Sequence, residues 1–315
     1  MIGKDIAYAR EQLEKGALVA IPTETVYGLA ANALDEAAVT KVFQAKKRPS
    51  FDPLIIHTDR WERVEQWVQH IPAVAHQLAA AFLPGPLTFL LPRRSMIPDL
   101  VTAGSPLVAI RIPNHPMTNE LLQQLDFPLA APSANPFGYI SPTTAQHVAD
   151  QLGAQVAYIL DGGPCQVGVE STIIGFEGSQ ATIFRKGGIP IEAVSDIIGP
   201  VNIQAFSTSN PQAPGMLKSH YAPRIPFHLG QLHELFQRFQ GQKIGVLAFR
   251  EGIPELPPDQ QILLSPQGDL AEAAQKLFSA MRHLDSLALD VIIAEPLPEE
   301  GLGRAINDRL RRAAV

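Results

Sequence analysis

The chain has 315 residues, of which 46% are hydrophobic and 18% charged, and its formal net charge is -6. This composition is that of a folded globular protein and excludes a disordered or fibrous chain. The acidic balance argues against a protein that wraps nucleic acid broadly, but it is compatible with a local basic pocket for a small anion. Because the length exceeds what one hydrophobic core usually serves, we expect a large domain and a smaller one.

The sequence also restricts the cellular compartment. A single cysteine, Cys165, excludes an internal disulfide and a Cys-rich zinc site, as is usual in a reducing compartment. No apolar run is long enough to span a bilayer, and residues 1–16 have the pattern of an amphipathic helix without the apolar centre of a signal peptide. We therefore expect a cytoplasmic protein that does not enter a membrane.

Segments of helical period alternate with short apolar runs through the first two hundred residues. We expect helices over residues 5–15, 35–47, 61–82 (interrupted at Pro72), 116–125, 143–152 and 191–198. Strands are expected over residues 17–21, 53–57, 87–91, 106–112, 156–160, 171–176 and 181–185. This alternation predicts an α/β or α+β fold.

A Pro-, Ser- and Asn-rich passage over residues 199–226 lacks periodicity and is typical of a linker. Beyond it, strands over 244–249, 261–264 and 290–295 alternate with helices over 269–283 and from Leu302 onward. The sequence therefore predicts a catalytic domain over residues 1–200, a linker over 201–226 and a small α/β domain over 227–315.

Polar side chains follow several of the apolar runs. The run "ALVAI" at residues 17–21 passes through Pro22 into Thr23, Glu24 and Thr25. Other predicted strands end in His or Arg. Because the ends of strands in mixed α/β sheets commonly converge on one ligand crevice, we expect Thr23 and Thr25 to contribute polar contacts to such a crevice.

Three further clusters are candidates for anion binding. Lys46, Lys47 and Arg48 close a helix before Pro49, which suits phosphate binding, although basic residues there also offset the helix dipole. The passage "PSANPFGYISPTTAQHV" gathers hydroxyls and an amide before a helix, which favours an anion or an ordinary cap at Ser141 or Thr143.

The third cluster is "DGGPCQVGVESTIIGF", residues 161–176. Its glycines begin like a phosphate-binding P-loop, but Val169 and Glu170 stand where Lys and Ser or Thr should follow, so it is not one. The passage instead predicts a loop close to a ligand. Cys165 has no adjacent base, and no motif of covalent catalysis is present.

In these pieces the chain resembles the L-threonylcarbamoyladenylate synthase family, with a YrdC-like domain in its longer, two-domain form. The matching pieces, in order over residues 17–223, are "PTETVYGL", "KKRPSFDPLIIH", "PGPLTFLL", "VAIRIPNHP", "PSANPFGYISPTTAQHV", "GGPCQVGVEST", "FRKGGI" and "APGMLKSHYAP". "EPLPEEGLGRAINDRLRRAA" is similar to the end of the family's second domain. The resemblance implies a YrdC-like twisted mixed sheet with flanking helices and a concave crevice, plus a small Rossmann-like α/β domain.

The activity that the resemblance implies joins L-threonine, bicarbonate and ATP into threonylcarbamoyl-AMP and releases pyrophosphate. This is the first step toward N6-threonylcarbamoyladenosine in tRNAs that read ANN codons. A downstream tRNA threonylcarbamoyl-transferase complex would receive the product. The family's chemistry requires no protein nucleophile, and Mg2+ is expected mainly on the ATP phosphates.

The resemblance also implies roles for individual residues, position by position. The threonine-binding set is Thr25, His57, Arg111, Ala131 through its backbone, and Ser171. The ATP-binding set is Lys46, Arg48, Ser133, Asn135, Ser141 and Arg185, of which Lys46 and Arg48 would act on the phosphates as catalytic residues. Asp52, which departs from the family pattern, is expected near the triphosphate, where it would either favour Mg2+ or point away. His220 and Tyr221 match a segment that folds over the pocket as a lid.

Three positions depart from the family pattern: Asp52 replaces a common Asn, Lys47 a frequent Gly, and Lys186 a frequent Pro. Two other functions compete with adenylate formation. Carbamoyl transfer from carbamoyl phosphate occurs in proteins with a similar domain, but those carry a Cys-rich zinc region that this chain lacks. A double-stranded RNA-binding module would use the Lys/Arg cluster on phosphates, and weak RNA binding is compatible with the sequence.

Overall fold

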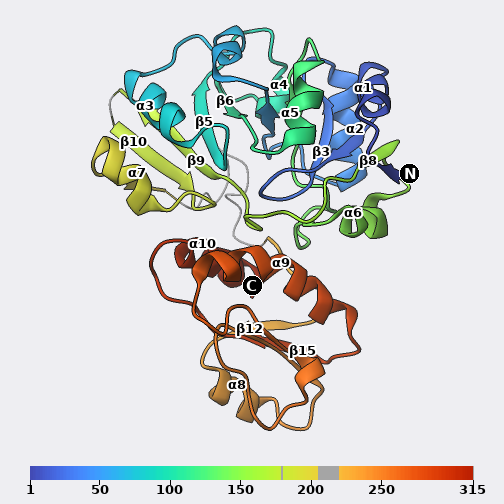
Figure 1. Ribbon diagram of the computed structural model, residues 1–315, viewed down its shortest axis with the longest axis vertical. Helices are drawn as coiled ribbons and strands as arrows, with labels where there is room; N and C mark the ends of the chain where they lie inside the picture. The colour runs from blue at the N-terminus through green and yellow to red at the C-terminus, as the bar shows by residue number, and fades with distance from the viewer. Residues whose placement is uncertain (179, 205–219, 315) are drawn as a thin grey trace.

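The computed structural model describes residues 1–178, 180–204 and 220–314. Figure 1 shows two parts stacked along the long axis, one built from the chain up to β11 and the other from β12 onward. The first part contains an 11-stranded sheet and the second a 4-stranded sheet. Within the described ranges, none of the helices combines the length and apolar character needed to cross a membrane.

The large sheet is mixed, and its strand order is β1-β8-β2-β3-β7-β4-β6-β5-β9-β10-β11. Parallel pairs such as β4 with β6 and β5 with β9 alternate with antiparallel pairs such as β5 with β6 and β9 with β10. The strands are β1 Ile2–Gly3, β2 Val19–Ile21, β3 Gly28–Asn32, β4 Ile55–His57, β5 Leu87–Pro92, β6 Leu107–Arg111, β7 Leu129–Ala130, β8 Tyr158–Leu160, β9 Thr172–Glu177, β10 Gln180–Arg185 and β11 Asn202–Ile203.

Helices flank this sheet, and their starts follow local sequence signals. Asp5 and Asp35 cap α1 and α2, each accepting hydrogen bonds from backbone N–H groups of the first turn. The predicted break at Pro72 is confirmed, since a 3-10 helix ends before it and α3 begins after it. The helices are α1 Ile6–Glu14, α2 Glu36–Lys46, η1 Trp61–Gln66, α3 Ala73–Phe82, α4 Asp99–Thr102, α5 Pro116–Gln123, α6 Ala145–Leu152 and α7 Ile191–Ile198.

One expected helix cap in this part was wrong, and the short elements β1, β3, β7, β11 and α4 were not predicted. The N-cap of α6 is Thr144, whose Oγ1 accepts from His147 N at 3.2 Å, and not Ser141 or Thr143. Ser141 instead turns its hydroxyl to the carboxylate of Glu170. The strand β3 was not predicted because "GLAAN" consists of residues with low strand propensity, which are held extended only by pairing with β2 and β7.

The second part is a parallel sheet in the order β12-β15-β13-β14. Its strands are β12 Phe227–Leu229, β13 Ile244–Ala248, β14 Gln261–Leu263 and β15 Val291–Ala294, and its helices are α8 Leu232–Arg238, η2 Pro258–Gln260, α9 Leu270–Ser286 and α10 Gly303–Ala313. Of these, β12, α8 and η2 were not predicted. Figure 1 shows α9 and α10 on the side of the sheet that faces the first part, and α8 on the far side.

The two parts share an apolar core. Val26, Ile140 and Val169 of the first part pack in one cluster with residues of α9 such as Leu277 and Phe278. Of the predicted linker over residues 201–226, only 201–204 and 220–226 are described, and the rest lies outside the described residues. The shared core brings α9 and α10 against the loops that contain Ile140 and Val169.

Candidate active site

The sheet topology brings the predicted polar strand ends together. Because β4 and β6 run parallel, their last residues, His57 and Arg111, are register partners. Ala131, just after β7, donates its N–H to Ile55 O at 3.0 Å. Arg185 closes β10 opposite the first residues of β9. The expectation that strand ends converge on one crevice is therefore met by the backbone.

A cleft with about 520 Å3 of empty volume opens at these strand ends. Most of its lining comes from residues that the sequence singled out. The lining residues are Val26, Arg48, Ile55, His57, Arg111, Ala131, Pro132, Ser133, Glu170, Arg185, His220 and Tyr221. Six other predicted residues are not part of this lining and contact residues behind or beside the wall. They are Thr25, Lys46, Asp52, Asn135, Ser141 and Ser171.

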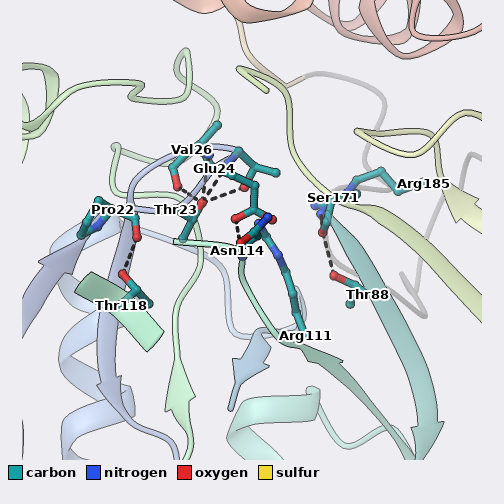
Figure 2. A network of polar contacts seen from close by, with 11 residues as sticks. Pro22, Thr23, Glu24, Val26, Thr88, Arg111, Asn114, Thr118, Ser171 and Arg185 are labelled. Atoms are coloured by element: carbon teal, nitrogen blue, oxygen red, sulfur yellow. Dashed lines mark hydrogen bonds and ion pairs between the residues drawn. The ribbon is translucent and has the colours of Figure 1, made fainter. Parts of the chain in front are cut away.

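In the turn after β2, the threonine hydroxyl groups form hydrogen bonds within the turn. Thr23 Oγ1 donates to Val26 O at 2.6 Å and lies 2.8 Å from Thr25 Oγ1, and both threonines are buried. Figure 2 shows the contact between Thr23 and Val26, which closes the turn that carries Glu24. Thr23 therefore fixes the backbone, and Val26 is the residue of this turn that faces the cleft.

Glu24 and Arg111 form a buried ion pair. Arg111 Nη2 lies 2.8 Å from Glu24 Oε1, and the side chains are only 5% and 6% exposed. The other carboxylate oxygen, Oε2, accepts from Asn114 N at 3.0 Å. In Figure 2 Arg111 reaches from the end of β6 toward Glu24. The pair orients the guanidinium at the cleft wall.

Arg185 is held at the opposite wall by Ser171. Arg185 Nε donates to Ser171 O and Nη2 donates to Ser171 Oγ, both at 2.9 Å. Ser171 Oγ is also 2.7 Å from Thr88 Oγ1, as Figure 2 shows. Burial lowers the pKa of Arg185 to about 10, so the guanidinium is still a cation at neutral pH. Ser171 acts on the cleft through this arginine.

The three cations at the end of α2, Lys46, Lys47 and Arg48, have different surroundings. Lys46 is buried and donates to Ser133 O and Asn135 O, each at 2.5 Å, so it ties α2 to the loop after β7. Burial and the neighbouring Arg48 lower the pKa of Lys46. Lys47 is exposed with a left-handed φ of 52°. Of the three cations, Arg48 is the one that lines the cleft.

Asp52 pairs with Arg48. Their charged atoms are 3.0 Å apart, and Arg48 also donates to the backbone oxygens of Asp52 and Pro53. The carboxylate that departs from the family pattern is therefore fully buried and orients Arg48. Phe137 lies under the guanidinium, with its ring centre 5.8 Å from the central carbon.

The loop after β7 is fixed by hydrogen bonds. Asn135 Nδ2 donates to Pro136 O and Tyr139 O at 2.8 and 2.7 Å, which closes the loop on itself. Ser133 forms an isolated bridge with Gly28 and faces the cleft. Ser141 Oγ donates to Glu170 Oε1 at 2.5 Å. Asn135 and Ser141 thus support the loop, while Ser133 is available at its surface.

His220 and Tyr221 form part of the cleft wall. The two rings pack edge to face with centroids 4.2 Å apart, and Tyr221 stacks on Phe278 of α9. Ala222 N donates to Gly138 O at 2.9 Å, which attaches this segment to the first part of the chain. Both residues line the cleft, and their predicted role as a lid stays a prediction.

The two histidines of the cleft are neutral at physiological pH. Burial, followed by the charge of Arg111, lowers the pKa of His57 to about 3. Burial also lowers the pKa of His220 to about 3, against the attraction of Glu170. Both rings therefore serve as neutral hydrogen-bonding groups, and the positive charge of the lining comes from Arg48, Arg111 and Arg185. Such a cleft suits an anion with several oxygens.

The chain supplies no metal cage of its own in the part that the structure describes. None of the described residues forms a group of three or more His, Cys, Asp or Glu side chains placed to hold a metal ion. The carboxylates nearest the cleft, Asp52, Glu24 and Glu170, are each paired with an arginine.

Glu170 was not among the predicted site residues. It lines the cleft, accepts from Ser141 and pairs with Arg309 of α10, with Nε and Oε2 2.8 Å apart. Its place before a strand in a Gly-containing loop was a usable signal. Arg309 gave none, because it stands among other charged residues on a helix whose pattern is that of a solvent-exposed one.

The comparisons with known proteins agree with this geometry. A family model described as telomere recombination matches residues 11–187, and one described as the C-terminal domain of threonylcarbamoyl-AMP synthase matches residues 189–315. A threonylcarbamoyl-AMP synthase of Pyrococcus abyssi is 41% identical, over 96% of this chain and 92% of that protein. The chain belongs to the threonylcarbamoyl-AMP synthase family.

Two further comparisons extend the match. The threonylcarbamoyl-AMP synthase of Bacillus subtilis is 40% identical, over 98% of this chain and 92% of its own length. The crystal structure of P. abyssi Sua5 complexed with L-threonine superimposes with a TM-score of 0.93 at 39% identity, covering 100% of this chain and 97% of that one. The resemblance, the two-part α/β fold and the expectation of an enzyme that forms an AMP adduct are therefore confirmed.

Proposed function

We propose that the cleft binds L-threonine, bicarbonate and ATP and converts them to threonylcarbamoyl-AMP, pyrophosphate and water. The observation that carries the proposal is the convergence of Arg48, Arg111 and Arg185 on one cleft beside the neutral His57. Three guanidinium groups complement a carboxylate and a triphosphate. The likeness to a structure solved with L-threonine supports the choice of amino acid.

The threonine subsite lies at the ends of β4 and β6. Arg111, oriented by Glu24, receives the threonine carboxylate, and the neutral His57 hydrogen-bonds the amino acid without repelling its ammonium. The backbone of Ala131 completes the wall, while Thr25 and Ser171 support it from behind. This arrangement holds the amine toward the cleft, where it combines with carbon dioxide or bicarbonate to form a carbamate.

The ATP subsite lies between α2 and the loop after β7. Arg48 and Arg185 contact phosphate oxygens, Ser133 hydrogen-bonds the nucleotide, and Lys46 holds the loop that carries Ser133 through its two carbonyl partners. Asp52, Asn135 and Ser141 fix these groups in place. The carbamate oxygen attacks the α-phosphorus, the bond to the bridging oxygen breaks, and pyrophosphate leaves.

We assign Mg2+ as the metal that accompanies ATP, bound mainly through the phosphates. When bound, it supplies charge neutralisation on the phosphate oxygens. Residues 1–200 would form the catalytic domain, 201–226 the linker with its lid residues His220 and Tyr221, and 227–315 the second domain. The lid excludes water from a carbamate and an adenylate that both hydrolyse readily.

Because the product is a reactive mixed anhydride, we place this step in the cytoplasm beside its consumer. A tRNA threonylcarbamoyl-transferase complex would transfer the threonylcarbamoyl group to the adenosine of tRNAs that read ANN codons. Weak RNA binding by this chain remains a prediction, and a steep salt dependence of RNA affinity would support it.

The deciding experiment measures pyrophosphate release from ATP and Mg2+ with bicarbonate, in the presence of L-threonine, of L-serine or of no amino acid. Release that needs threonine and bicarbonate together, with a threonylcarbamoyl-AMP product identified by mass, supports the proposal. Arg48→Ala should then lower kcat/KM for ATP by about 100-fold or more, since a phosphate-binding cation is lost. Folded protein that releases pyrophosphate only with carbamoyl phosphate, or not at all, would refute it.

A further inference from the structure

Several contacts between the two parts of the chain fall on two loops beside the cleft, while others reach Gln151 of α6 and Glu192 of α7. These cleft loops are residues 138–142 and 167–171. From α9, Arg282 donates to Ser141 O at 3.1 Å and to Ile140 O, and Asp285 accepts from the hydroxyl of Tyr139. From α10, Arg309 pairs with Glu170. The helices of the second part therefore act on loops that border the proposed substrate sites.

Glu170 is the group that joins the cleft loops to each other and to α10. One oxygen, Oε1, accepts from Ser141 Oγ at 2.5 Å, and the other, Oε2, accepts from Arg309 Nε at 2.8 Å. Glu170 itself lines the cleft. A change at Arg309 is thus transmitted through one carboxylate to the hydroxyl of Ser141.

Arg309 contacts Tyr221, and its helix also contacts His220. Its side chain is 0% exposed, its Nη1 lies 2.7 Å from Asp308 Oδ2, and its central carbon lies 5.1 Å from the centre of the Tyr221 ring. The backbone N–H of His220 donates to Arg312 O on the same helix at 3.3 Å. A buried arginine that holds a carboxylate and an aromatic ring fixes the geometry of both.

We propose that Arg309 is a positioning residue for the adenylate-forming site, acting from the second domain by fixing Glu170 and, through it, Ser141 and Tyr221. The inference rests on the proposed function for its substrates. It assigns the second domain a part in forming the site, because α10 supplies a side chain that the first domain lacks at this point. Without Arg309, Glu170 keeps Ser141 as a partner but loses the cation that neutralises it in a buried place.

The test compares the wild type with Arg309→Gln, Glu170→Gln, the double variant and Arg311→Gln. Arg311 is the matched control, since it lies on the same helix, is 49% exposed and pairs with Glu299. We measure melting temperature, kcat and KM for ATP and for L-threonine, and the affinity for ATP with Mg2+ by calorimetry. Arg309→Lys is included because it keeps a positive charge at the buried position. It can be measured even if Arg309→Gln does not fold.

We expect Arg309→Gln to lower kcat/KM for ATP by about 100-fold, since displacement of reacting groups by about 1 Å costs that much. Arg311→Gln should stay within about twofold of the wild type, as exposed pairs contribute little. In the Glu170→Gln background, Arg309→Gln should add less than about threefold, because residues of one network are not additive. Arg309→Lys should retain the fold and weaken ATP binding more than threonine binding.

Several outcomes would overturn the proposal. The first is an unchanged ATP affinity and kcat in a folded Arg309→Gln or Arg309→Lys variant. The second is an equal loss of kcat/KM on Arg309→Gln whether residue 170 is Glu or Gln. The third is a lower melting temperature with unchanged kinetic constants. The proposed function fails separately: a wild type that binds ATP but forms no adenylate refutes that function, while ATP affinity still reports on Arg309.

Discussion

The two parts of the molecule place their buried charges differently. In the first, charged and polar side chains lie at strand ends, where His57, Arg111 and Arg185 meet in the cleft. In the second, the parallel sheet is apolar, and the buried charges lie on helices, with Arg282 on α9 and Arg309 on α10. The first part therefore presents charge to a ligand, and the second presents it to the first part.

The difference follows from what each surface must do. A strand end leaves side chains free to turn into a crevice, which is where α/β sheets bind ligands. A helix that packs over a neighbouring domain buries one face, and any charge there has to be paired, as Asp285, Asp308 and Arg309 are. The comparison predicts that substitutions in the first part impair chemistry and those in the second impair the arrangement of the cleft loops.

The largest effect is expected at the strand ends, from Arg111→Gln. It leaves Glu24 buried without its cation, so we expect a loss of about 3–5 kcal/mol in the free energy of unfolding as well as loss of threonine-dependent activity. Urea unfolding measures the first and pyrophosphate release the second.

Arg10→Gln is the control for this loss, because Arg10 pairs with Glu14 on an exposed face of α1 and should change stability by less than about 1 kcal/mol. If the two variants lost equal stability, the Glu24 pair would not be a distinct buried element. If Arg111→Gln kept threonine-dependent activity, the assignment of the carboxylate partner would be wrong.

A smaller effect is expected where the parts touch, from Gly168→Ala. Gly168 has φ of 76°, and a Cβ there would lie 2.4 Å from Ala274 O and from Gln275 Cα of α9. We expect a loss of about 1–3 kcal/mol from this crowding, together with a lower kcat/KM, because the loop carrying Glu170 must move. Thermal unfolding and the pyrophosphate assay measure the two.

Gly104→Ala separates backbone strain from crowding. Gly104 has a similar φ of 77°, but a Cβ added to it would meet no atom of the described residues within 4 Å, so that variant should lose only about 1–2 kcal/mol from the backbone conformation. Equal losses of stability and activity in both variants would show that contact with α9 does not set the loop.

The same contrast explains how far the sequence predicts the structure. Strand ends were recognisable because His57, Arg111 and Arg185 each follow an apolar run, and the Asp35 cap and the break at Pro72 are local signals. Short strands such as Gly28–Asn32 depend on pairing with distant strands and carry little propensity of their own.

The burial of Arg309 could not be predicted for a related reason. On α10 the spacing of charged residues is that of a solvated face, and only the packing of the two parts makes it internal. The pairing of Arg48 with Asp52 could not be predicted either. The two residues are four positions apart in the sequence, but the turn at Pro49 decides whether the carboxylate contacts a metal or the arginine.

The smallest effect is a pH dependence of the contact around Asp285. Burial alone would raise the pKa of Asp285, but hydrogen bonds from Tyr139, from the backbone of Ile225 and from Arg224 hold it below its usual value of 3.8. A carboxyl with a lowered folded-state pKa contributes stability above its unfolded pKa and loses it as the pH falls through the folded one. Arg282 also faces this carboxylate and remains charged throughout.

We therefore expect the stability advantage of the wild type over Asp285→Asn to be constant from about pH 7 to pH 5 and to shrink below about pH 4. Urea midpoints at intervals between about pH 3 and pH 7 measure it. Arg224→Ala is the matched control, because that side chain is 74% exposed and its loss leaves the Tyr139 and backbone hydrogen bonds to Asp285 in place. If the advantage of the wild type persists undiminished at about pH 3, the interface depends on the shape of Asp285 and not on its charge. The contrast between buried charges that face a ligand and buried charges that face the other part would then not apply to α9.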